Sequence, residues 1–212
     1  MTNKKIISKT KKEKILKKAA QLFIESGYRN TTTKELAKAI GIQGPGFYHY
    51  FNSKEDVLLE ILEMGARKFQ EYVIDYLSDA SDPEEKIKRL IRNLIRVIAK
   101  FGEIPLLFDK SLLKNITKKA KGEKGVREKH AYYFMREILQ RFAETRGNRE
   151  TIDLNVATFS LIGMSVWTQK WYNPKGKLTI EELADQMIHL FLHGFLSNQT
   201  LVSQIRSPEE VI

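Results

Sequence analysis

Apolar side chains recur every three or four residues along most of this 212-residue chain. The clearest series is Ile87, Leu90, Ile91, Leu94, Ile98 and Phe101. Such spacing gathers apolar side chains on one face of an α-helix, whereas a half-buried strand alternates apolar and polar residues. We find no convincing alternating stretch and no internal repeat in the sequence. The pattern therefore predicts an all-α chain.

Glycines, prolines and capping residues divide this pattern into about nine predicted helices. The boundary residues are Gly27, Gly41, Pro45, Ser53, Asp82, Gly102, Pro105, Gly147, Glu150, Trp171 and Thr179. Capping pairs are expected at three helix starts: Thr32 with Glu35, Ser53 with Asp56, and Thr179 with Glu182. A short sixth helix should follow Pro105, a polar loop should span Lys118 to Gly125, and the eighth helix should run from about Glu150 to Trp171.

Composition excludes several classes of protein. A hydrophobic content of 42% is enough for a core. No run of about 18 apolar residues could span a bilayer, and no apolar segment follows the basic N-terminus as in a secretory signal. The sequence has no cysteine, which excludes disulfides, thiolate metal sites and cysteine catalysis and fits a reducing compartment. We therefore expect a cytoplasmic protein without a cofactor.

The net charge of +10 is unevenly distributed. Residues 1–56 hold 12 Lys and Arg against 5 Asp and Glu, and the remaining residues hold 24 against 21. A basic end on a nearly neutral body suggests a polyanionic partner at that end. Nucleic acid is the first candidate and an anionic membrane surface the second. The stretch from Lys4 to Lys12, taken alone, also fits a disordered solubilising tail.

Residues 31–56 carry the most specific pattern. Thr32 and Glu35 predict a capped helix of only about two turns, too short to bury enough surface alone. Gly41 allows a tight left-handed turn, after which a second short helix turns its apolar residues, Phe47 and Phe51, inward. Two short helices joined by a glycine-containing turn and braced by a preceding amphipathic helix form a helix-turn-helix.

In a helix-turn-helix the second helix enters the major groove of DNA, and the first helix and the flanks hold the backbone. Threonine, tyrosine and lysine grip phosphates from such positions, and we expect Thr33, Tyr48 and Lys54 to do so. The candidate DNA-binding residues are Thr32, Thr33, Gln43, Gly44, Pro45, Gly46, Tyr48, His49 and Lys54.

The segments from Ala19 to Tyr28, Thr32 to Gly41 and Tyr48 to Leu58 resemble the DNA-binding domain of TetR-family regulators. The resemblance covers about residues 10–62. It implies a DNA-binding domain with a basic arm at residues 1–55 and a larger helical ligand-binding and dimerisation domain at residues 56–212. It further implies a homodimer joined through the eighth and ninth helices, and release of DNA when a cavity in the second domain fills.

The recognition helix departs from the family's common residues. Many members carry Ser-Lys-Gly-Thr-Leu-Tyr where this chain runs from Gln43 to Tyr48. Gly44 and Gly46 offer no side-chain atoms to base edges. We therefore expect Gln43, which suits adenine, and His49 to read the bases. The two glycines alternatively reflect simple local flexibility.

The C-terminal part is rich in aromatic residues, which fit either an ordinary core or the lining of an apolar pocket. The candidate ligand-binding residues are Phe101, Leu107, Phe108, Phe134, Ile138 and Trp167. The stretch from Trp167 to Gln186 resembles TetR-type regulators of fatty-acid and acyl-CoA degradation. That resemblance implies a long-chain acyl-CoA as effector, although the same stretch also fits a role in dimer architecture alone.

Small residues three apart on the eighth helix would let a partner helix approach closely. A single copy of this surface would expose a large apolar patch, which a two-fold dimer buries while matching a palindromic operator. The candidate interface residues are Ala157, Ser160, Gly163, Met187, Leu190, Phe191 and Phe195.

Three other patterns have a simpler interpretation than a binding or catalytic site. His189 and His193 have metal-ligand spacing but fit packing or an interface better, so we expect no metal. Residues 163–167 resemble a nucleophile elbow but lack its final glycine, and no convergent acid–base set suggests an enzyme. A stripe that could hold phosphates of coenzyme A fits a solvated helix face better: Arg89, Arg92, Arg96 and Lys100.

The sequence therefore predicts a ligand-responsive repressor that binds palindromic operator DNA as a homodimer and is released by a small apolar effector. A multidrug-responsive repressor of an efflux gene is one alternative. A basic protein held on a membrane surface by an amphipathic helix, from Lys4 to Lys18, is the alternative outside gene regulation.

Overall fold

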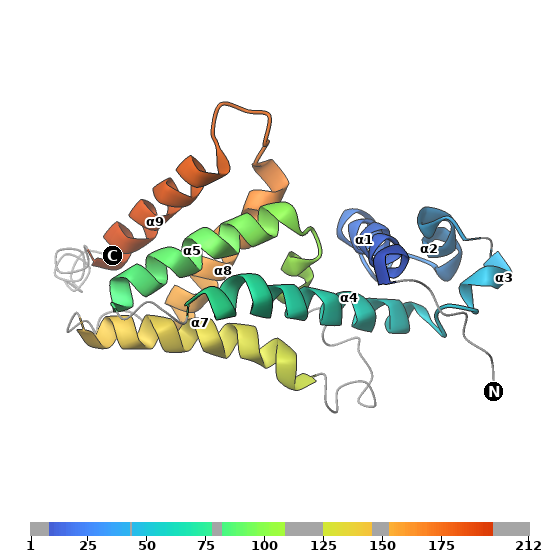
Figure 1. Cartoon of the computed structure of the whole chain (residues 1–212), viewed down its shortest axis with the longest axis horizontal. Helices are drawn as coiled ribbons and strands as arrows, with labels where there is room; N and C mark the ends of the chain where they lie inside the picture. The colour runs from blue at the N-terminus through green and yellow to red at the C-terminus, as the bar shows by residue number, and fades with distance from the viewer. Residues whose placement is uncertain (1–8, 43, 78–81, 109–124, 146–152, 197–212) are drawn as a thin grey trace, which may run out of the picture. The chain divides into compact units, whose positions relative to one another are not determined.

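The computed structural model describes residues 9–42, 44–77, 82–108, 125–145 and 153–196. These ranges contain helices, turns and no strand, so the all-α prediction is confirmed for them (Figure 1). The α-helices are α1 (Lys9–Ser26), α2 (Thr33–Ile40), α3 (Gly44–Phe47), α4 (Lys54–Phe69), α5 (Pro83–Lys100), α7 (Gly125–Thr145), α8 (Leu154–Trp171) and α9 (Ile180–Leu196). Within the described ranges they are fewer than the about nine that the sequence predicts for the whole chain.

Two boundaries differ from the prediction. Where the sixth helix was expected to begin, the described residues form a 3-10 segment, η3 (Ile104–Phe108), in which Ile104 N–H donates to the Phe101 carbonyl at 3.1 Å, and residues 109–124 lie outside the described part. Helix α8 begins at Leu154 because the Asp153 carboxylate accepts hydrogen bonds from the backbone N–H groups of Asn155 and Val156, at 2.7 and 3.1 Å. Glu150, Gly147 and the polar loop before Gly125 lie outside the described residues.

The long fourth helix changes its hydrogen-bonding pattern at its end. It continues from α4 into a π-helical segment, η1 (Gln70–Ile74), and a 3-10 turn, η2 (Asp75–Leu77). Contacts divide the chain into one compact unit of residues 1–71 and 100–130 and another of residues 72–99 and 131–212. The division therefore falls inside the π-helical segment, and the functional boundary expected at residue 55 stays a prediction.

In the first unit, α4 packs against α1 and against η3. The buried side of α4 includes Leu58 and Ile61, which are fully enclosed. At Gly65 the helix surface is flat, and a Cβ atom there would lie 3.4 Å from the side chain of Leu107 in η3. Phe69 and Phe108 close the same contact, with ring centroids 6.1 Å apart.

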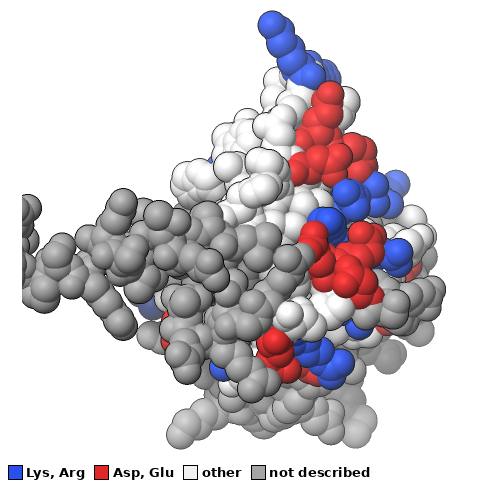
Figure 2. Space-filling view, turned by 90° about the vertical axis from the view of Figure 1, so that its left-hand side faces the viewer, with Lys and Arg blue, Asp and Glu red and all other residues white. Residues whose placement is uncertain are grey.

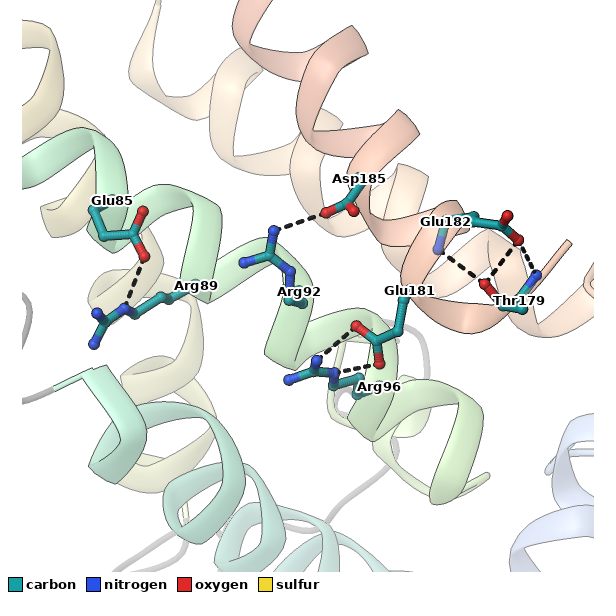
Figure 3. Close-up of polar contacts among 8 residues, drawn as sticks. All are labelled: Glu85, Arg89, Arg92, Arg96, Thr179, Glu181, Glu182 and Asp185. Atoms are coloured by element: carbon teal, nitrogen blue, oxygen red, sulfur yellow. Dashed lines mark hydrogen bonds and ion pairs between the residues drawn. The ribbon is translucent and has the colours of Figure 1, made fainter.

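In the second unit, α8 packs against α9, and charged side chains join α5 to α9. Arg92 lies 2.7 Å from the Asp185 carboxylate, and Arg96 donates two hydrogen bonds to Glu181 at 2.6 and 2.8 Å (Figure 3). The prediction of a solvated arginine stripe therefore fits better than phosphate binding. In Figure 2, acidic and basic side chains lie next to one another along the right-hand part of the view.

A buried ion cluster joins three elements of the first unit. The Lys68 ammonium on α4 lies 2.9 Å from Glu13 on α1 and 2.5 Å from Glu103, just before η3. Glu103 is only 1% exposed. Burial of Lys68 disfavours its charge, but hydrogen bonds to Glu103 and Glu13 outweigh burial and raise the pKa of Lys68. The ammonium also lies 4.3 Å from the centre of the Phe101 ring.

This cluster predicts a large cost for removing the cation alone. We expect Lys68→Met to lower the free energy of unfolding by about 3–5 kcal/mol, because it leaves a buried carboxylate without a partner. Adding Glu103→Gln should recover most of that loss, since the amide carries no charge. Urea unfolding at fixed protein concentration measures both values. Equal stability of the single and double variants would show that the buried charge is unimportant.

Candidate nucleic-acid interface

Helix α2 begins with the predicted capping box. The Thr32 hydroxyl accepts from the backbone N–H of Glu35 at 3.2 Å, and the Thr32 backbone N–H and hydroxyl donate to the Glu35 carboxylate at 2.8 Å each. The backbone hydrogen bond from Thr32 holds the pKa of the Glu35 carboxyl below its usual range. This short helix then buries Leu36, Ala37 and Ile40.

The turn after α2 depends on one left-handed residue. Gly41 has φ of 77°, a conformation that a side chain would strain, and its N–H bonds back to the end of α2. The next residue, Ile42, donates its N–H to the Ala37 carbonyl at 2.9 Å. These bonds turn the chain from α2 into α3 (Figure 1), and the three N-terminal helices form the predicted helix-turn-helix.

Helix α3 is a single turn held by aromatic side chains. Phe47 and Phe51 are 1% and 0% exposed, with ring centroids 5.6 Å apart. A Cβ atom at Gly46 would lie 3.0 Å from the Ile42 side chain, so close packing, and not flexibility alone, explains a glycine there. Tyr48 is 57% exposed and His49 is also exposed. The exposed aromatic and imidazole side chains of this segment therefore lie directly after α3.

The first turn of α4 is capped by Ser53, whose hydroxyl accepts from the Asp56 N–H at 3.1 Å. The other half of the expected capping box is different, because the Asp56 carboxylate accepts the backbone N–H of Asn52, at 3.1 Å, instead of that of Ser53. The Asp56 carboxylate is thus hydrogen-bonded to the residue before the cap.

Lys54 points back into the domain. Its ammonium donates to the carbonyl oxygens of Tyr28 at 2.9 Å and Thr31 at 2.8 Å. It also lies 4.4 Å from the centre of the Tyr28 ring. The Tyr28 hydroxyl donates to the Glu55 carboxylate at 2.9 Å, and burial followed by this bond raises the pKa of Tyr28. The sequence did not suggest Tyr28 and Thr31 as partners of Lys54.

Of the other predicted DNA-binding residues, Thr32 and Thr33 lie at the start of α2, and Gly44 and Pro45 begin α3. Gln43 lies outside the described residues. Exposed lysines occupy the outer sides of the first two helices: Lys11, Lys14, Lys18, Lys34 and Lys38. The first unit thus presents threonine, tyrosine, histidine and lysine side chains around the helix-turn-helix.

Comparison with known families identifies this arrangement. Residues 15–61 match the profile of the bacterial regulatory proteins of the TetR family, and residues 80–195 match a tetracycline repressor-like C-terminal domain. The chain belongs to the TetR family of transcriptional regulators.

Three similar proteins illustrate the match. The transcriptional repressor KstR2 of Mycolicibacterium smegmatis is 24% identical over 90% of this chain and 93% of its own. The transcriptional regulator QacR of Staphylococcus aureus is 43% identical over 60 residues, which are 28% of this chain and 32% of QacR. The crystal structure of AibR with isovaleryl coenzyme A and operator DNA is 28% identical, with a TM-score of 0.70 over 85% of this chain and 97% of AibR.

The predicted ligand-binding residues are not all enclosed. Ile138 is buried in the second unit, and Phe101 and Leu107 are buried in the first. Phe108 and Phe134 are half-buried. Trp167, however, is 65% exposed on the outer side of α8, so in the single chain it does not line an interior cavity. The lining role of Trp167 is therefore the least supported of these predictions.

Some of the predicted dimer residues are exposed and others are buried. Ser160, Gly163 and Leu190 are exposed. Ala157, Met187 and Phe191 are buried within the chain, because they point towards its own core. The side chain of Phe195 lies outside what the structure describes. The predicted interface thus combines residues of the inner and outer faces of α8 and α9, because helical periodicity alone did not separate the two faces, and its role in a dimer stays a prediction.

The remaining patterns suggest no second site. His189 and His193 lie on the exposed side of α9 with ring centroids 3.9 Å apart. The described part of the chain holds no group of three or more His, Cys, Asp or Glu that could bind a metal ion. In the same part, no helix is long and apolar enough to cross a membrane.

Matched capping boxes allow the DNA-binding role of α2 to be tested. Thr179 and Glu182 at the start of α9 have the same three hydrogen bonds as Thr32 and Glu35. We expect Thr32→Ala and Thr179→Ala each to cost about 1 kcal/mol of stability. Only Thr32→Ala should weaken binding to duplex DNA in fluorescence anisotropy. Equal weakening by both variants would argue against α2 as part of the interface.

Proposed function

We propose that this chain is a ligand-responsive repressor that binds palindromic operator DNA as a homodimer. The observation that carries the proposal is the helix-turn-helix with Tyr48 and His49 exposed at the end of α3. In this motif the second helix reads the major groove, and we assign base reading to Gln43 and His49. We assign the phosphate contacts to Tyr48 and to Thr33 at the start of α2.

The outer side of α8 supports the dimer. It carries large apolar side chains that are 43% to 65% exposed: Val156, Phe159, Trp167 and Trp171. At 100° per residue these side chains surround Gly163, which has open space where a Cβ atom would lie. Leu190 on α9, 64% exposed, adds to this surface. An exposed apolar helix face with a glycine at its centre suits close packing against the same face of a second copy.

Gly163→Leu tests this interface without disturbing the chain itself. Because nothing lies within 4 Å of a Cβ atom at Gly163, the leucine should fit in the monomer. It should, however, prevent close approach of a partner helix, so sedimentation should shift towards monomer and operator affinity should fall at least tenfold. Glycine to alanine at the same position is the mild control. An unchanged dimer in the leucine variant would exclude α8 as the centre of the interface.

We further propose a small apolar effector, an acyl-CoA, that lowers operator affinity. The class of effector is supported by the 28% identity to AibR, whose structure holds isovaleryl coenzyme A and operator DNA. Within the second unit, Phe134 and Ile138 remain candidates for contact with an acyl chain, since each buried CH₂ contributes about 0.8 kcal/mol. Arg92 and Arg96 are engaged by carboxylates and are poor candidates for the phosphates. Genes of acyl-CoA metabolism would then be the regulated ones.

The test is a titration of the chain bound to DNA from its own upstream region. Acyl-CoAs of several chain lengths should reduce affinity at least tenfold, which requires about 1.4 kcal/mol of coupling, and free coenzyme A should not. Phe134→Ala should blunt the response and leave binding of the free protein to DNA intact. Release only by cationic drugs would instead favour a multidrug-responsive repressor. If no compound acts, the effector proposal is wrong and the DNA-binding proposal stands on the unliganded affinity.

A further inference from the structure

We propose that Lys54 is a positioning residue that fixes the corner between α1 and α2 to the first turn of α4, and that it is not a phosphate ligand. The proposal rests on the proposed DNA-binding function, because the corner that Lys54 holds leads directly into the helix-turn-helix. It reverses the role that residue type and position suggested for this lysine.

The contacts of Lys54 are internal and short. Two hydrogen bonds, of 2.9 and 2.8 Å, run from the ammonium to the carbonyl oxygens of Tyr28 and Thr31. The charge also lies over the Tyr28 ring, 4.4 Å from its centre. Two of the three ammonium donors are therefore used within the chain. Only the third N–H donor is left for any other acceptor.

The position of Lys54 in its helix needs such partners. It is the first residue of α4, directly after the cap Ser53. A positive charge at a helix N-terminus is unfavourable, because the helix dipole places partial positive charge there. The two carbonyl oxygens and the aromatic face of Tyr28 supply the opposite charge that offsets this cost.

The corner needs Lys54 in turn. Tyr28 and Thr31 are 5% and 2% exposed, so their carbonyl oxygens are largely withdrawn from water and need donors. Within the corner, the Tyr28 carbonyl accepts only a long bond of 3.3 Å from the Thr31 N–H. Glu55, the next residue of α4, adds a second tie by accepting from the Tyr28 hydroxyl at 2.9 Å. The first turn of α4 therefore binds the corner at three atoms: the carbonyl oxygens of Tyr28 and Thr31 and the hydroxyl of Tyr28.

The corner bears on DNA binding because it leads straight into α2. Thr31 is adjacent to Thr32, the cap of α2, and Thr33 begins the helix. Any displacement of the first turn of α4 therefore reaches the start of α2 through a single residue. Lys54 therefore positions Thr32, the cap of α2, and Thr33, a proposed phosphate contact, and affects the affinity for DNA through them.

Salt dependence distinguishes the two roles. We expect Lys54→Met, which keeps the packing of the chain on Tyr28 but removes the charge, to weaken operator binding about tenfold at every salt concentration. Its plot of log affinity against log salt should run parallel to that of the wild type. A lost phosphate contact would instead reduce the slope by about 0.9 per protomer, or about 1.8 for the dimer, and the two lines would converge at high salt. Lys34→Met, at an exposed lysine of α2, controls for the loss of one positive charge.

Two further measurements separate positioning from simple loss of fold. Stoichiometric titration with operator should give the same active fraction for Lys54→Met and wild type, so the change lies in Kd. Hydrogen exchange of the DNA-free protein should increase at residues 28–34 in Lys54→Met and not in Lys34→Met. Converging salt plots, a reduced active fraction with unchanged Kd, or unchanged exchange would each overturn the proposal. If the wild type itself fails to bind its operator, the proposed function fails, while the exchange measurement still tests the corner.

Discussion

The packing of α4 is the constraint on which the first unit depends. This helix packs against α1, encloses the side chains of Leu58 and Ile61, and meets η3 at Gly65, where a Cβ atom would lie 3.4 Å from Leu107. Helices as short as α2 and α3 are marginal on their own. Helix α2 packs against α1, and α3 packs against α2 and gains the aromatic contact between Phe47 and Phe51. The orientation of the helix-turn-helix is therefore a property of α4 and its neighbours.

Local signals in the sequence predicted local structure well. The Thr32 and Thr179 capping boxes, the left-handed Gly41 and the helical class follow from interactions among residues within five positions of one another. Such interactions need no knowledge of the fold, because the chain brings their partners together itself. The predicted start of α8, at about Glu150, was wrong by a few residues. Asp153 caps the helix instead, because its carboxylate accepts the backbone N–H groups of Asn155 and Val156.

Interactions between distant residues could not be predicted in the same way. The partners of Lys54 lie 26 and 23 residues away, and Glu103 lies 35 residues from Lys68. Helical periodicity gives the face of a helix on which a side chain lies but not the element that the face meets. This is why the internal partners of Lys54 could not be predicted from the sequence, nor the 65% exposure of Trp167 in the single chain.

In the second unit, arginines of α5 have partners within the chain, whereas large apolar side chains of α8 are exposed to solvent. This difference favours the proposed dimer. Arg92 and Arg96 of α5 already have carboxylate partners on α9, and Arg89 has one on α5 itself, in exposed pairs that contribute little to stability. On the outer side of α8, Trp167 and Trp171 are 65% and 52% exposed in the single chain. Association can still gain free energy by burying such apolar surface. In the proposed dimer, a second copy of the same face, meeting at Gly163, would supply that burial and leave the ion pairs between α5 and α9 unchanged.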